Sequence, residues 1–169
     1  MPKMDASPPS GLDTAIAVRC VGLDAGQARL LDLLSELGPE RLARVPAGLH
    51  NSLAALALHV AATEVRMAYR LTGRQPGDIP APLRAAYLMD GPQSPLPQPQ
   101  GETAATLRAK AEQARGLLRE ALAGLREADL EREVVMGPER TATVRWMLTL
   151  LPSHQLQHFG QMQIIRQLV

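Results

Sequence analysis

Residues 51–71, with the sequence NSLAALALHVAATEVRMAYRL, form the stretch that decides the fold of this chain. Its apolar side chains recur every three to four residues and make one helical stripe: Leu53, Leu56, Val60, Met67 and Leu71. Asn51 or Ser52 can cap the first turn, and Gly73 follows the last periodic residue, where helices commonly stop. We therefore predict an amphipathic helix over residues 51–71.

Three further segments have the same helical period, over residues 13–37, 103–128 and 142–168. Gly22 and Gly26 weaken the middle of the first segment, and a Gly-Pro pair ends it. Pro152 lies inside the last segment, where it should kink the helix or break its hydrogen bonding locally.

The connection over residues 73–101 holds seven of the 14 prolines, too many for a regular helix or a central strand. A crossover of this length is natural in a bundle whose second and third helices run in the same direction. We expect a short helix near residues 83–88 within it, and two short extended pieces over residues 130–143. The fold class is thus predicted as all-α, a four-helix bundle with a long crossover between helices 2 and 3.

The length of 169 residues suits one domain with a core of its own. We assign residues 1–11, which are rich in proline, to a disordered leader, and residues 12–169 to a single soluble domain. Aromatic residues make up only 2 % of the chain, so aliphatic side chains must fill the core. Trp146 and the methionines are most simply core residues as well.

Charge and cysteine content exclude several classes of function. A formal net charge of +1 gives no electrostatic footprint for nucleic acid. No apolar run reaches the roughly 18 residues that a membrane span needs, so we expect no membrane partner. Cys20 is the single cysteine; it fits a cytoplasmic location and is expected to be a small buried hydrophobe.

The spacing of two histidines suggests a metal site. His154 and His158 lie four residues apart, so one helix presents both imidazoles on one face. Imidazole is a common ligand for divalent transition metals, and a third ligand must come from another segment. His59, in the middle of an apolar helix, is the candidate. His50 precedes that helix and points to another side, and it is expected at the surface.

Ordinary explanations compete with this one, because a lone histidine is more often a plain core or surface side chain than a ligand. The zinc-protease motif needs a glutamate directly after its first histidine. Gln155 occupies that place here, which argues against a metalloprotease. Glu64 lies about 140° around the helix from His59, and we expect it to be a surface or interhelix charge.

Two stretches resemble the motifs of the DinB/YfiT-like family. Residues 48–64 (GLHNSLAALALHVAATE) are similar to its first motif, although they lack the usual tryptophan. Residues 143–161 resemble its closing motif, a histidine pair four apart followed by one residue and Gly-Gln. Order and length match from residue 12 to residue 169. The resemblance implies a four-helix bundle that binds one divalent transition metal through His59, His154 and His158.

The resemblance also implies chemistry. Similar enzymes include thiol S-transferases that use bacillithiol or mycothiol, and a thiol-dependent isomerase. Three neutral imidazoles leave the ion an open position, as in catalytic sites. We therefore expect a metal-dependent transferase acting on a small-molecule thiol and an electrophile, or a hydrolase that uses metal-bound water. Zinc or nickel suits the ligands best, and iron or manganese remains compatible with them.

Other assignments stay open. Gln161 shares the face of the histidine pair and either orients an imidazole or a bound water, or bonds to a neighbouring helix. No catalytic residue or general base can be named. The alternative function is a non-catalytic, stress-related metal-binding bundle acting as a homodimer, which the resemblance permits. A plain helical interaction module with incidental histidines is a third reading.

Overall fold

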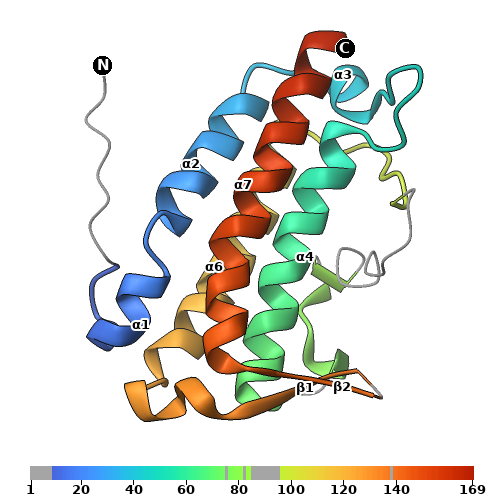
Figure 1. The fold of residues 1–169 in the computed structure, drawn as a ribbon. Helices are drawn as coiled ribbons and strands as arrows, with labels where there is room; N and C mark the ends of the chain where they lie inside the picture. The colour runs from blue at the N-terminus through green and yellow to red at the C-terminus, as the bar shows by residue number, and fades with distance from the viewer. Residues whose placement is uncertain (1–8, 75, 82, 85–95, 138) are drawn as a thin grey trace.

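The computed structural model describes residues 9–74, 76–81, 83–84, 96–137 and 139–169. Within these ranges, four long helices form the bundle: α2 (Leu23–Leu34), α4 (Leu53–Thr72), α6 (Ala104–Ala123) and α7 (Val144–Leu168). Helices α4 and α6 run in one direction, and α2 and α7 run in the other (Figure 1). Each of α4 and α2 packs against both α6 and α7, which closes the bundle. The predicted fold class is confirmed.

Helix α4 is the most buried element, and its ends agree with the prediction to within two residues. The Ser52 hydroxyl accepts a hydrogen bond from the Ala55 N–H (3.2 Å) and so caps the first turn. At the other end, Gly73 adopts a left-handed φ of +69° and its N–H reaches the Tyr69 carbonyl. Nearly every side chain between these caps is buried, because α4 packs against α6, α7, the short helix that precedes it and the strand over residues 133–137.

The crossover returns the chain from the end of α4 to the start of α6 (Figure 1). It begins with the short 3₁₀ helix η1 (Pro76–Asp78). Ala81, Leu83 and Arg84 are helical, while residues 85–88 of the expected short helix lie outside the described residues. Its last part runs beside the start of α4, where the Asn51 carboxamide oxygen accepts a hydrogen bond from the Leu96 N–H (2.8 Å).

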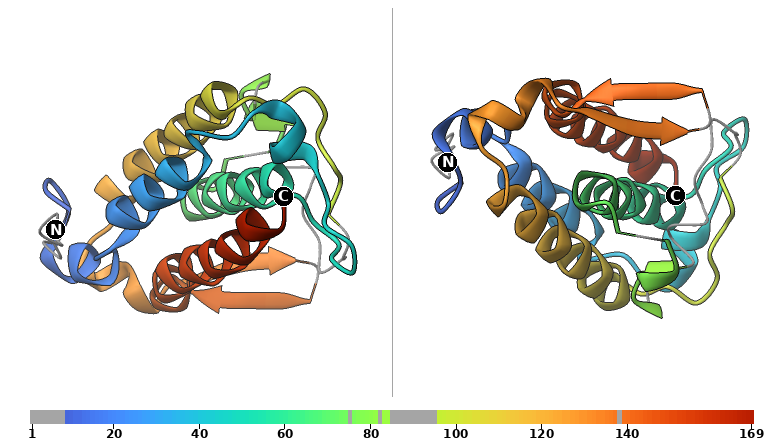
Figure 2. Two further views of the ribbon diagram at one scale, coloured as in Figure 1. Left: turned by 90° about the horizontal axis from the view of Figure 1, so that it is seen from above. Right: turned by 90° about the horizontal axis from the view of Figure 1, so that it is seen from below.

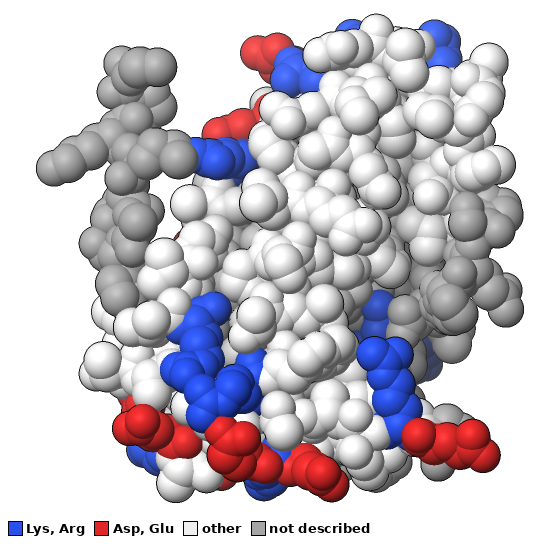
Figure 3. Space-filling model, viewed as in Figure 1, with Lys and Arg blue, Asp and Glu red and all other residues white. Residues whose placement is uncertain are grey.

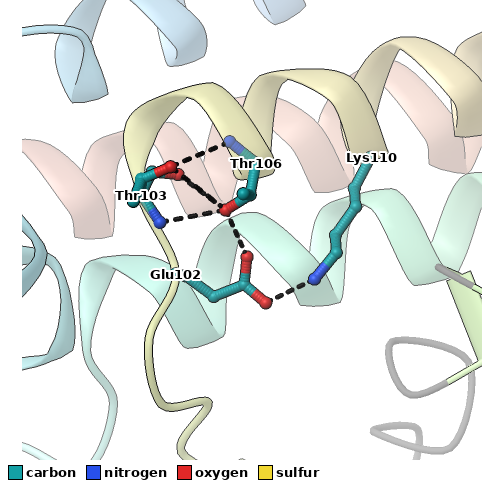
Figure 4. Close-up of polar contacts among 4 residues, drawn as sticks. All are labelled: Glu102, Thr103, Thr106 and Lys110. Carbon is teal, nitrogen blue, oxygen red and sulfur yellow. Dashed lines mark hydrogen bonds and ion pairs between the residues drawn. The ribbon is translucent and has the colours of Figure 1, made fainter.

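A polar network starts α6, as Figure 4 shows. Thr103 and Thr106 form a capping box, each hydroxyl accepting from the other residue's backbone N–H (3.1 and 2.9 Å). The Thr106 hydroxyl donates to Glu102 (2.7 Å), whose other carboxylate oxygen pairs with Lys110. A carboxylate at the N-terminus also complements the helix dipole.

The predicted helix over residues 13–37 is wrong in its middle. The structure divides it into α1 (Thr14–Arg19) and α2 (Leu23–Leu34). Gly22 has a φ of +88°, a left-handed conformation that cannot continue a right-handed helix. After α2, a further short helix that was not predicted, α3 (Pro39–Ala43), begins on a proline at its first position.

The two extended pieces expected over residues 130–143 form an antiparallel hairpin of β1 (Glu133–Gly137) and β2 (Arg140–Thr143). It follows the 3₁₀ helix η2 (Glu127–Glu131) and lies beside one end of α7 (Figure 2). The placement of Trp146 in the core was wrong. Its side chain is 40 % exposed and lies 5.5 Å from the Arg140 guanidinium. Met147, one residue later, points into the core instead.

A buried ion pair links three of the four bundle helices. Arg115 of α6 forms a fork on Glu64 of α4, with Nε to Oε2 at 3.0 Å and Nη2 to Oε1 at 2.6 Å. Its remaining terminal nitrogen donates to Asp24 of α2 (2.9 Å), which also pairs with Arg119 (2.6 Å). Burial raises the pKa of Glu64, and the Arg115 charge opposes that rise. Glu64 is therefore an interhelix charge, as expected.

We predict that Arg115→Met destabilises the fold by about 3–5 kcal/mol, because it leaves the Glu64 carboxylate buried without its partner. Adding Glu64→Leu to this variant should restore part of the loss, since no unpaired charge then remains. Urea denaturation measures both. Arg108→Met is the matched control: its pair with Glu112 is exposed, and its loss should cost less than about 0.5 kcal/mol. Equal losses for the two single variants would contradict a stabilising role for the buried pair.

Candidate metal centre

The three predicted histidines meet between α4 and α7. His59 Nε2 lies 3.0 Å from His154 Nε2, and His158 Nε2 lies 3.1 Å from the same atom. One ligand atom from each residue lies within 4.8 Å of the other two. All three side chains are half-buried. Helix α7 runs through Pro152 without interruption, so the i, i+4 geometry of His154 and His158 is kept.

The donor set fits a cation. Metal–nitrogen bonds of about 2.0–2.1 Å place neighbouring ligand nitrogens roughly 3 Å apart, close to the two Nε2 separations of 3.0 and 3.1 Å. A neutral imidazole carries one N–H, so the proton on His154 Nε2 can point straight at only one of the two nitrogens beside it. Three converging nitrogens are therefore better matched by a positive ion than by hydrogen bonds among themselves. The cluster can hold a metal ion.

Gln161 lies against the outer nitrogen of His158. Its Oε1 is 2.7 Å from His158 Nδ1, and a carboxamide oxygen accepts hydrogen bonds only. With the amide in this orientation, His158 Nδ1 carries the proton and donates it to Gln161 Oε1, which leaves the Nε2 lone pair directed at the cluster. Gln161 thus contacts His158 on its own helix, and its role in orienting that imidazole stays a prediction. By contrast, His59 Nδ1 is buried and has no hydrogen-bond partner in the described structure.

The site keeps its imidazoles neutral at physiological pH. Burial, together with the neighbouring His158 and Arg66, lowers the pKa of His59 to about 4. The same causes, with His59 added, lower the pKa of His154 to about 3. Burial also lowers the pKa of His158, against the effect of its bond to Gln161. Metal ligands must be unprotonated, so this environment favours binding.

Two residues beside the cluster were missed by the sequence analysis. The Thr63 hydroxyl donates to the His59 carbonyl (3.0 Å) and accepts from Arg66 Nη2 (3.0 Å). Arg66 is 5 % exposed, and its charge contributes to the low pKa of both His59 and His154. Positions four and seven residues after His59 fall on the same helix face, so this spacing was the available signal.

The remaining residues singled out from the sequence lie outside the cluster. His50 is exposed, as expected. Cys20 is fully buried, and burial raises the pKa of its thiol to about 11, so it is not a ready thiolate. In the described part of the chain, no Asp, Glu or Cys joins the three imidazoles. An ion held there would keep positions open for another ligand.

The fold and this histidine cluster define a helical-bundle protein with a potential metal site. The DinB superfamily model matches residues 23–162, and the chain belongs to that family. A conserved protein from Enterococcus faecalis, known from its crystal structure, has a similar fold, with a TM-score of 0.65 and 18 % identity. The similarity covers 87 % of this chain and 92 % of that one. A search among curated proteins gives no match. Among the described residues, no helix is long and apolar enough to span a bilayer.

We predict that His158→Ala abolishes stoichiometric zinc binding, because it removes one ligand of three. Untagged protein is loaded with zinc, desalted and analysed for metal content. The parent chain should retain about one ion per chain. His50→Ala removes an exposed histidine outside the cluster and should retain as much as the parent. Equal zinc in all three proteins would show that the metal is bound elsewhere.

A second prediction concerns Gln161. Gln161→Met removes the acceptor at His158 Nδ1 while keeping a side chain of similar length, so the ring loses its preferred tautomer. Zinc affinity should fall by about 10–100-fold, measured by competition with a chromophoric chelator. Gln163→Met, an exposed change on the same helix, should have no effect. If the two variants bind zinc equally well, the contact has no role in orienting the ligand.

Proposed function

We propose that this protein is a metal-dependent transferase that activates a low-molecular-weight thiol, of the bacillithiol or mycothiol class, for attack on an electrophile. The convergence of three ring nitrogens, which no carboxylate or thiolate of the described residues joins, carries this proposal. His59, His154 and His158 would hold the ion, which supplies the positive charge that stabilises a thiolate at neutral pH. Zinc or nickel fits an all-imidazole set best.

The charge of a bound ion supports an anionic substrate group. Among the described residues no carboxylate or thiolate joins the three imidazoles, so an ion held there would keep its full positive charge. Arg66, a buried cation on α4, contributes to the low pKa of His59 and His154. A substrate thiol bound to the ion would therefore lose its proton to solvent more readily.

The proposed thiol transfer is balanced without a general base from the protein, because the thiol loses its proton to solvent. The thiolate sulfur forms a bond to an electrophilic carbon, and the leaving group departs with its bonding electron pair. Hydrolysis by activated water is the close alternative. Water has a second proton to lose and gains more from a general base, and within the described ranges of the chain no carboxylate or thiol joins the three imidazoles. That difference favours the thiol.

We predict that zinc-loaded or nickel-loaded protein speeds the reaction of a thiol with monobromobimane over the thiol alone. Fluorescence of the product measures the rate. His158→Ala should lose the acceleration together with the metal, whereas His50→Ala should keep it. A loaded parent protein that binds metal but gives no acceleration with bacillithiol, mycothiol or cysteine would support the non-catalytic, stress-related bundle instead.

We also propose that the protein forms a homodimer through the exposed face of α7. Large apolar side chains are exposed along this helix: Trp146 (40 %), Leu156 (66 %), Ile164 (59 %) and Leu168 (56 %). Figure 3 shows few charged side chains over the middle of this side of the molecule, with the charges gathered toward its edges. A two-fold interface sets one patch against its own copy, and an uncharged patch avoids like-charge repulsion there.

Light scattering during gel filtration should find the parent chain as a dimer. Ile164→Glu places a charge in the patch and should convert it to a monomer, since two carboxylates would then face one interface. Val135→Glu introduces the same charge on the hairpin at a more exposed position (69 %) and should leave the dimer intact. A monomeric parent chain would refute the interface, with no consequence for the metal centre.

A further inference from the structure

Gln155 is a buried polar residue on α7, directly after His154 and three residues before His158, with 4 % of its surface exposed. It points at α2, away from the metal cluster. With the amide turned so that each atom meets a complementary group, Nε2 donates to the Leu23 carbonyl (3.1 Å) and Oε1 accepts from the Gln27 N–H (3.0 Å). Both partners are backbone atoms, so the contact does not depend on neighbouring rotamers.

The two backbone groups that the amide contacts lie next to each other on α2. The carbonyl of Leu23 and the N–H of Gln27 are four residues apart, the spacing of a hydrogen-bonded turn at the start of this helix. The amide reaches them because Gly26 has no side chain: a Cβ there would lie 2.7 Å from the Gln155 amide. A glycine that only weakens a helix when seen in the sequence thus makes room for a contact between two helices.

Helix α7 needs external support at this point. Pro152, two residues before His154, has no N–H, so the carbonyl of Leu148 loses its usual helical partner. The helix packs between α2 on one side and α4 on the other. Its rotation about its own axis decides whether His154 and His158 face His59.

A small rotation of α7 would be enough to move its ligand atoms out of reach of a shared ion. Side-chain tips lie about 5–6 Å from a helix axis, so a rotation of about 20° moves them by about 2 Å. That displacement equals a whole metal–nitrogen bond of about 2.0–2.1 Å.

We propose that Gln155 is a positioning residue of the metal centre: by fastening α7 to the backbone of α2, it sets the rotation at which His154 and His158 face His59. The proposal rests on the proposed metal-binding function. Gln155 touches neither the ion nor a substrate. It acts through the helix that carries two of the three ligands.

The test compares Gln155→Met with Gln157→Met. The first removes both bonds to α2 at similar side-chain length. The second makes the same change directly before His158, at an exposed position. Zinc alone is the probe, titrated against a chromophoric chelator. Gln155→Met should lose about 10–100-fold in affinity and Gln157→Met less than about twofold. Circular dichroism should show unchanged helix content in both. Folded Gln155→Met with parental affinity would overturn the proposal.

Two additions keep the test decisive. Gly26→Ala adds a methyl group on α2 that displaces the Gln155 amide, and it leaves the sequence of α7 unchanged. It should therefore weaken zinc binding even if Gln155→Met fails to fold. Imidazole nitrogen chemical shifts of the metal-free protein report the surroundings of the rings directly. Gln155→Met should shift those of His154 and His158, and Gln157→Met should leave those of His154 unchanged. A parent chain that binds no zinc refutes the proposed function, while these shifts still decide for or against the positioning role.

Discussion

The packing of α4 against α7 is the contact on which the rest of the molecule depends. It brings the ring of His59 to within 3.0 Å of a ring that lies 95 residues away in the sequence. Neither helix could bind a metal alone, because one supplies a single imidazole and the other a pair. The other helices act through this contact: α6 and α2 hold the two helices from the opposite side of the bundle.

Two buried polar contacts hold that packing, and they differ in kind. The Glu64–Arg115 fork ties α4 to α6 and, through Asp24, to α2. It is an ion pair whose members are costly to separate, since either would be left as a charge in the interior. The Gln155 amide ties α7 to α2 by neutral bonds to the backbone. The fork thus secures the helix of His59, and the amide the helix of the other two ligands.

The electrostatics of the site follow from the same arrangement. Burial between α4 and α7 is the largest cause of the low pKa of His59 and His154, and the Arg66 charge adds to it. The bundle thereby presents neutral donors beside a cation. In the part of the chain that the structure describes, no carboxylate or thiolate joins the three imidazoles, so an ion bound there would keep its full positive charge.

The sequence by itself determined the long helices α4, α6 and α7, their order, and the three histidines that we propose as ligands. Leucine and alanine at helical spacing define α4, α6 and α7, and seven prolines between residues 73 and 101 define the crossover. These features are local, so periodicity and turn chemistry reveal them. The i, i+4 spacing of His154 and His158 is local too, and the resemblance to a family supplied His59 as their third partner.

Only the tertiary structure decided how distant segments pair. The break at Gly22 depends on a left-handed backbone that residue type permits but does not require. Trp146 turned out to be exposed because Met147 takes the inward position. Arg115 and Gln155 read as ordinary polar helix residues in the sequence. Their partners lie on other helices, and no periodicity within one helix carries that information.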